Sequence, residues 1–235
     1  MNDENVQGET VLEVIACTVE DAVEAELGGA NRLEVISRFD LGGLTPSLDL
    51  VREIKDKVSI PLRVMMRENI GYEIKGGAEI KTLCSAAREL NKIGVDGVVL
   101  GFLEGTDIDI ETTRRVLDAA PDLNATFHHA FEDTVNKFAA IRRLKEMPQI
   151  DRILSHGGDG TPDERAVRLA GYKMTANPEI EIIAGGRVDA DVIEVLRRET
   201  AISEFHVGSA ARIKGKVERS RVVELVNAMS AKSYV

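Results

Sequence analysis

Residues 11–36 read VLEVIACTVEDAVEAELGGANRLEVI, which contains one complete strand–helix–strand unit. A β-rich run at 12–16 is followed by Thr18, a residue type that caps helix N-termini, with acidic residues in the first turn behind it. The helical run ends at the two glycines at 28–29, because glycine readily adopts the left-handed conformation that ends helices. A second β-rich run follows at 32–36. The spacing predicts two parallel strands joined by a helix.

The same alternation continues along the rest of the chain. Further strands are expected at 62–66, 97–100, 124–128, 152–154, 181–184 and 204–207. Helices are expected from Ser47 to Lys57, near Glu79–Asn91, over Glu111–Ala120, from Thr134 to Lys145, following Pro162, following Asp189 and over Glu218–Met229. Repeated βα units in 235 residues predict an α/β fold, a single-domain TIM-like (β/α)8 barrel. The alternative is an open doubly wound sheet, but that fold usually has a glycine-rich turn after its first strand, where this chain has CTVE.

The composition limits which partners the chain is expected to bind and in which cellular compartment it is expected to occur. The formal net charge of −10 disfavours binding to nucleic acids and to anionic membranes. No stretch approaches the roughly 18 apolar residues that a transmembrane helix needs. Two cysteines, Cys17 and Cys84, make no disulfide framework, which favours a reducing cytoplasm. The acidic start MNDEN lacks the regions of a secretory signal, so we expect a disordered tail over 1–10 and the barrel over 11–235.

Charged side chains alternate with apolar ones along the predicted strands. Because the outer strand face packs under the helices, the polar set should face the barrel lumen. That set comprises Glu13, Glu34, Arg63, Arg67, His128 and His206. Buried charges cost several kcal/mol each unless they are paired, so we expect the two glutamates and two arginines to neutralise one another. Either a structural salt-bridge network or catalysis would explain Glu13, Glu34 and Arg63. Arg67 and His128 stand at strand ends, where barrel active sites lie.

Two glycine-containing turns predict an anion site. Gly185-Gly186-Arg187 follows the seventh strand, and Gly208-Ser209 follows the eighth. Phosphate sites in these barrels often use the loops after these two strands. Glycine lets the backbone approach an anion, and Arg187 could supply charge.

Metal binding is the less favoured use of the same residues. A divalent ion on Glu13, Glu34, His128 and His206 would be repelled by the neighbouring arginines, Arg63 and Arg67. His128 and His129 do not form a metal motif by themselves, because adjacent strand residues face opposite ways. Cys17, at the active end of the first strand, is the better thiol candidate of the two cysteines.

Several segments resemble the CutC copper-homeostasis family. The loop Gly42-Gly43-Leu44-Thr45-Pro46-Ser47 is similar to that family's signature loop, and the segment from Thr126 to Phe131 is similar to its TFHRAFD segment. The runs 12–14, 32–34 and 205–206 match in order, so the likeness spans about 12 to 212. The resemblance implies a TIM-like barrel, a soluble cytoplasmic protein, often a homo-oligomer, and copper binding or copper tolerance.

The chain also departs from that pattern. Family members often carry cysteines near the ends of strands one and two as suspected Cu(I) ligands, but here the second position is Ile36 and only Cys17 remains. The arginine of TFHRAFD is His129 and its aspartate is Glu132. Soft Cu(I) prefers thiolate or thioether ligands, so the departures favour a different ligand.

Three functional hypotheses follow. In the first, the barrel binds a small anionic metabolite, with or without transforming it. Its candidate catalytic residues are His128, Glu34, Glu13 and Arg67, and its candidate anion-binding residues are Gly185, Gly186, Arg187, Gly208 and Ser209. In the second, the chain handles copper as its cofactor, with Cys17 and His206 as candidate metal ligands and Met65 or His128 assisting. In the third, the charged lumen is purely structural. The expected partners are a small anion or metal ion and further copies of the chain, a dimer or higher homo-oligomer, without nucleic acid or membrane.

Overall fold

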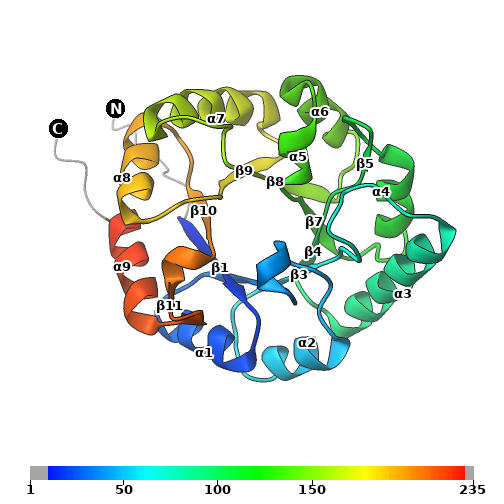
Figure 1. Ribbon diagram of the computed structural model, residues 1–235, viewed down its shortest axis with the longest axis horizontal. Coiled ribbons are helices and arrows are strands. Elements are labelled where there is room, and N and C mark those ends of the chain that lie inside the picture. The colour runs from blue at the N-terminus through cyan, green and yellow to red at the C-terminus, as the bar shows by residue number, and fades with distance from the viewer. Residues whose placement is uncertain (1–9, 231–235) are drawn as a thin grey trace, which may run out of the picture.

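The computed structural model describes residues 10–230, and the strands of this part of the chain close into a parallel barrel (Figure 1). Around the barrel the order is β1 (Val11–Ala16), β10 (Glu204–Val207), β9 (Glu181–Ala184), β8 (Ile150–Ser155), β7 (Asn124–Phe127), β4 (Gly97–Leu100), β3 (Leu62–Met65) and β2 (Arg32–Val35). Every pairing in the ring is parallel, and β1 closes it by pairing with both β2 and β10. The predicted TIM-like barrel is therefore confirmed, and the open sheet is wrong.

The helices form a ring outside the strands (Figure 1). They are α1 (Val19–Leu27), α2 (Leu48–Lys55), α3 (Gly77–Ile93), α4 (Ile110–Leu117), α6 (Lys137–Leu144), α7 (Pro162–Ala176), α8 (Ala190–Glu199) and α9 (Arg219–Ser230). The predicted caps hold: Thr18, Ser47 and Asp189 each accept a hydrogen bond from a backbone amide of the first helical turn. Thr161 adds a reciprocal capping box ahead of Pro162.

The predicted helix start at Thr134 is wrong. A short helix, α5 (Ala130–Asp133), directly follows β7, and Thr134 lies at its C-terminal end. Asn136 caps α6 instead, accepting from the amide of Ala139. Between residues 10 and 230 the loops also contain two short 3-10 turns and two small antiparallel hairpins, none of which was expected from the sequence. These are η1 (Phe39–Leu41), η2 (Ser209–Ala211), β5–β6 (Leu103–Glu104 with Asp107–Ile108) and β11–β12 (Arg212–Ile213 with Lys216–Val217).

The alternation of side chains divides the interior into two regions. The large apolar core lies between strands and helices, and outward-facing strand residues such as Leu12, Val14 and Leu33 have no exposed surface. A second, small apolar cluster of Ile36, Met65 and Val99 lies apart from it, on the opposite strand face. The polar residues of the strands share that inner face, which places them in the lumen as predicted.

Two further expectations from the sequence concern the N-terminal tail and membrane-spanning helices. The expected tail over 1–10 lies outside the described residues, apart from Thr10. Among the helices of residues 10–230, none combines the length and the apolar character that crossing a bilayer requires.

Candidate functional site

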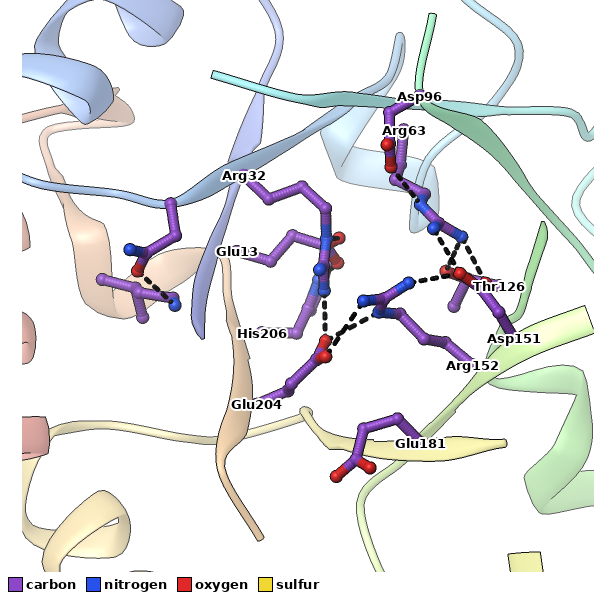
Figure 2. Close-up of polar contacts among 12 residues, drawn as sticks. Glu13, Arg32, Arg63, Asp96, Thr126, Asp151, Arg152, Glu181, Glu204 and His206 are labelled. Carbon is purple, nitrogen blue, oxygen red and sulfur yellow. Dashed lines mark hydrogen bonds and ion pairs between the residues drawn. The ribbon is translucent and has the colours of Figure 1, made fainter. Parts of the chain in front are cut away.

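A salt-bridge network fills the amino-terminal half of the lumen (Figure 2). Arg32 donates to Glu13 and, through Nη2, to Glu204 at 2.6 Å. Arg152 also donates to Glu204, at 2.8 Å, and contacts Asp151. Glu13, Arg32 and Glu204 are buried, Arg152 and Asp151 are partly buried, and each guanidinium has carboxylate partners. This arrangement meets the requirement that buried charges be paired, so the network has a structural role.

Arg63 is also part of this network. Its partners are aspartates rather than Glu13 and Glu34, the glutamates that were expected to pair with it. Its two terminal nitrogens donate to both oxygens of Asp151 at 2.7 Å, and its Nε donates to Asp96 at 3.0 Å. The predicted neutralisation of Glu13 and Glu34 by Arg63 and Arg67 is therefore wrong. The register explains the difference, because the aspartates lie at the amino ends of the strands, level with the Arg63 head group.

Glu13 links this network to the upper half of the lumen. Its Oε1 lies 2.8 Å from Nδ1 of His206, and Nε2 of His206 lies 3.8 Å from Oε2 of Glu34. Burial opposes ionisation of Glu13, yet the charges and hydrogen bonds of Arg32 and His206 lower its pKa well below the ordinary range. Glu13 is therefore ionised, and it holds His206 with the Nδ1 proton directed at itself.

Glu34 shows the opposite behaviour. Burial, reinforced by the charge of Glu13 and opposed by His206, raises its pKa to about 7. Burial also opposes charging of His206, but the two glutamates raise the pKa of the imidazole overall. Glu34 and His206 can therefore hold one proton between them near neutral pH. The Oε1 atom of Glu34 is buried and has no hydrogen-bond partner within residues 10–230.

A cavity of about 450 Å³ opens at the carboxyl ends of the strands, the mouth of the barrel. Most of the predicted site residues border it: Glu34, Arg67, His128, Gly186, Arg187, His206, Gly208 and Ser209. Apolar side chains, among them Ile15, Ile36, Met65, Leu154 and Val188, complete the lining. Three predicted residues lie elsewhere. Glu13 sits below the cavity behind His206, Gly185 packs against Leu154 and His206, and Cys17 does not line the cavity.

Arg67 is a buried cation without a carboxylate partner. Its side chain donates to the backbone carbonyls of Ile70, Gly71, Gly42 and Gly43, and no ion pair of the described residues includes it. The guanidinium also stacks on Tyr72, with Cζ 4.9 Å from the ring centroid. These contacts hold the loops after β2 and β3 together, and the positive charge remains uncompensated at the cavity wall.

His128 presents a fixed neutral tautomer. Its Nδ1 accepts a hydrogen bond from the amide of Ala130 at 3.1 Å, so the ring proton is on Nε2. Nε2 is buried and lacks a partner within residues 10–230. Burial, followed by the charges of Arg67 and His129, lowers the pKa of His128 to about 3. The imidazole is therefore neutral at physiological pH and offers one N–H donor.

His129 is a cavity residue that the alternation rule assigned to the wrong face. β7 ends at Phe127, and His129 already has helical backbone angles (φ −59°, ψ −7°), so the period of two no longer applies. Both histidines line the cavity, and the buried Nδ1 of His129 also has no partner in the described residues. Burial lowers the pKa of His129 to about 3 as well, with His206 and His156 adding to the shift. The end of the β-rich run near His128 was the feature of the sequence that could have indicated that His129 lies beyond the strand.

The loop after β9 is held from behind by Arg165 of α7. The guanidinium of Arg165 donates to the carbonyl of Gly186 at 2.8 Å and approaches those of Gly185 and Arg187 at 3.4 and 3.5 Å. The N–H of a trans peptide points opposite to its C=O, so the amides of Gly186, Arg187 and Val188 point away from Arg165. These three residues line the cavity. The Arg187 side chain itself is exposed beside Asp159.

A family model described as the CutC family matches residues 10–211. The chain belongs to the CutC family. A CutC family protein of Xanthomonas campestris pv. campestris (strain 8004) is 30% identical over 207 residues, which cover 88% of this chain and 86% of the relative. One from Bacteroides fragilis (strain YCH46) is 30% identical over 210 residues, covering 88% and 83%.

One solved structure agrees with this CutC assignment, and another shares the barrel fold. The crystal structure named for the copper homeostasis protein CutC of Streptococcus agalactiae has a TM-score of 0.77 at 26% identity, covering 85% of this chain and 98% of that one. A thiamine phosphate pyrophosphorylase of Pyrococcus furiosus has a TM-score of 0.62 at 17% identity, covering 96% and 98%. At that identity the likeness concerns the barrel fold alone.

The side chains of this CutC-family chain do not fit copper. Cys17 has the guanidinium of Arg212 3.7 Å from its sulfur, and burial raises the pKa of its thiol, although Arg212 opposes the shift. Cys17 and His206, the predicted metal ligands, do not share the cavity. Within residues 10–230, no three His, Cys, Asp or Glu side chains are grouped so that they could hold a metal ion. Among the described residues that line the cavity, Met65 is the one with a soft sulfur ligand.

Proposed function

We propose that this CutC-family chain binds a small anionic metabolite in the mouth cavity of its barrel. The observation that carries the proposal is Arg67, a buried guanidinium whose partners are neutral carbonyls. A buried charge without a counter-charge is costly, and an anion entering the cavity would compensate it. The outward-turned amides of Gly186, Arg187 and Val188 supply further donors on the opposite loop.

The size and polarity of the cavity support a small organic anion rather than a macromolecule. A volume of about 450 Å³ lies in the range of small-molecule pockets, roughly 300 to 1,000 Å³. Its apolar wall residues, such as Ile36 and Leu154, would contact the carbon skeleton, while the polar groups would hold its charged end. The Streptococcus agalactiae neighbour is named for copper homeostasis, but residues 10–230 of this chain contain no group of three His, Cys, Asp or Glu side chains that could hold a metal ion.

The test is a thermal-shift screen with inorganic phosphate, ribose 5-phosphate and 2-oxobutyrate, alongside Cu(I) under reducing conditions. An anion present at 100 times its dissociation constant adds about 2.7 kcal/mol, which raises Tm by roughly 5 to 10 °C for a domain of this size. We expect Arg67→Ala to lose the response and Arg67→Lys to keep part of it, since lysine retains the charge but not the planar fork.

The matched control is Arg52→Gln, which removes an exposed arginine of α2 whose partner is Asp49. It should keep the full anion response. An anion response that is the same in the wild type and in Arg67→Ala, or no response to any anion, would contradict the proposal.

A further inference from the structure

We propose that Glu34 and His128 act together to enolise a small anionic carbonyl compound, with Glu34 moving a proton between carbon atoms and His128 donating a hydrogen bond to the carbonyl oxygen. This inference rests on the anion binding proposed above and adds the class of substrate and reaction.

Glu34 has the position of a general base. Its side chain is 3% exposed and lines the cavity, and its Oε1 has no partner within residues 10–230. Buried carboxylate oxygens almost always accept hydrogen bonds, so an unpartnered one at a cavity wall indicates a ligand group that meets it there. The carboxylates of the amino-terminal network all accept hydrogen bonds from arginines of the chain. Glu34, above that network, has no such arginine partner among the described residues.

The residues behind Glu34 support proton transfer. Arg32 holds Glu13 ionised, Glu13 holds the Nδ1 proton of His206, and Nε2 of His206 lies 3.8 Å from Glu34. The raised pKa of His206 favours its cationic form, which stabilises the Glu34 carboxylate before it accepts the substrate proton, and return of that proton to the substrate restores the starting charges. Burial raises the pKa of Glu34 to about 7, the range in which a carboxylate is an effective base at neutral pH. His206 and Glu13 are positioning residues, since they act through Glu34.

His128 has the position of the electrophilic partner. The amide of Ala130 fixes its proton on Nε2, and that N–H has no acceptor in the described residues. Burial and the nearby Arg67 keep the ring neutral, with a pKa of about 3. A buried neutral imidazole N–H stabilises the negative charge that develops on a carbonyl oxygen without first losing a proton itself.

The step balances without a cofactor. The Glu34 carboxylate takes the proton of the carbon next to the carbonyl, the electron pair of that C–H bond forms a C=C bond, and the carbonyl π electrons move to the oxygen held by His128. Return of the proton to the former carbonyl carbon of a hydroxy carbonyl, with the hydroxyl proton shifting between the two oxygens, gives the isomer. Return to the original carbon gives exchange. Nothing is oxidised or reduced overall, and Arg67 holds the anionic end throughout.

The experiment follows deuterium exchange by proton NMR in D₂O, with dihydroxyacetone phosphate, ribose 5-phosphate and 2-oxobutyrate as probes. We expect the wild type to remove the signal of the C–H next to the carbonyl faster than buffer does for at least one probe that also raises Tm. Glu34→Gln should slow this exchange at least 100-fold and His128→Gln at least 10-fold, while the thermal shift by the probe persists. Glu181→Gln, at the amino end of β9 and bound to Lys173, is the matched control and should change neither quantity.

The outcomes separate the two proposals. A probe that raises Tm without exchanging, or exchange that persists in Glu34→Gln, overturns the enolisation and leaves anion binding in place. A complete lack of thermal shifts overturns both. Should Glu34→Gln fold poorly, Glu34→Asp tests the same point, because a shortened carboxylate should exchange more slowly with an unchanged thermal shift. His206→Gln should displace the acid limb of the pH–exchange profile, which a merely structural histidine would leave in place.

Discussion

Replacing Glu13 with glutamine tests whether the lower lumen is a charge network that depends on its central carboxylate. Glu13 is fully buried and accepts from Arg32 and, at 2.8 Å, from His206. Removing one member of a buried ion pair typically costs about 3 to 5 kcal/mol, because the remaining charge has lost its partner. Arg32 keeps its second partner, Glu204, at 2.6 Å. We therefore expect the low end of that range, a loss of about 3 kcal/mol in the free energy of unfolding.

The assay is urea unfolding at pH 7 with the slope fitted separately for each variant. Glu53→Gln is the control, since Glu53 is an exposed carboxylate on the outer helix α2. The pKa of Glu13 is lowered in the folded protein, so its stabilisation is present above the ordinary carboxyl pKa and is lost as the pH falls towards the folded value. The difference between wild type and Glu13→Gln should accordingly shrink in acid. A loss below about 1 kcal/mol at pH 7 would refute the reasoning that this pair carries a full buried charge.

Three further predictions concern the cavity. Gly101→Ala would place a Cβ 2.5 Å from Nδ1 of His128, so we expect a loss of roughly 1 to 3 kcal/mol in urea unfolding together with slower deuterium exchange of the probes, while the anion thermal shift persists as in His128→Gln. Because the folded pKa of Glu34 is raised to about 7, the stability it contributes should decline as the pH rises from about 5 to 7, by at most about 1.4 kcal/mol per pH unit, and the raised pKa of His206 should add to the decline only above its ordinary value of 6.5. Glu34→Gln should flatten this decline in urea unfolding measured across that range, and an unchanged slope would contradict the assignment. Cys17→Ser should leave both the anion response and any Cu(I) uptake, measured by metal analysis after dialysis, as in the wild type, whereas a loss of stoichiometric copper would restore the metal hypothesis.

The barrel could be predicted from the sequence because its determinants are local. Thr18, Ser47 and Asp189 are capping residues beside helical runs, and each caps the helix expected of it. The apolar alternation along 12–16 and 32–36 fixes which face packs under the helices. The missed elements are short and lie in loops, as with α5, where no periodic pattern is long enough to be seen.

The pairing of charges could not be predicted, because it depends on how the strands are staggered around the ring. Alternation alone placed Arg63 and Glu34 on the same inner face, and they are register partners on β3 and β2. The Arg63 head group nevertheless reaches Asp151, whose strand shifts register against β7 near Ala125. Neighbouring positions along one strand are readable in a sequence, whereas the partner across a closed ring of tilted strands is a tertiary property.

The hypothesis that the charged lumen residues are purely structural explains the amino-terminal half of the barrel but not the mouth. At the amino end, Arg32, Arg63 and Arg152 each meet carboxylates at bonding distance, as a stabilising network requires. At the mouth, the Arg67 guanidinium contacts backbone carbonyls and the Tyr72 ring but no carboxylate of residues 10–230, and Glu34 and His128 each retain a buried polar atom without a partner in the same part of the chain. Each such atom costs free energy in the unliganded protein, and the cost falls at the end of the barrel where ligands bind. Lumen charges in a barrel can therefore be sorted by whether the protein itself satisfies them, and here that criterion favours a ligand at the mouth over a second structural network.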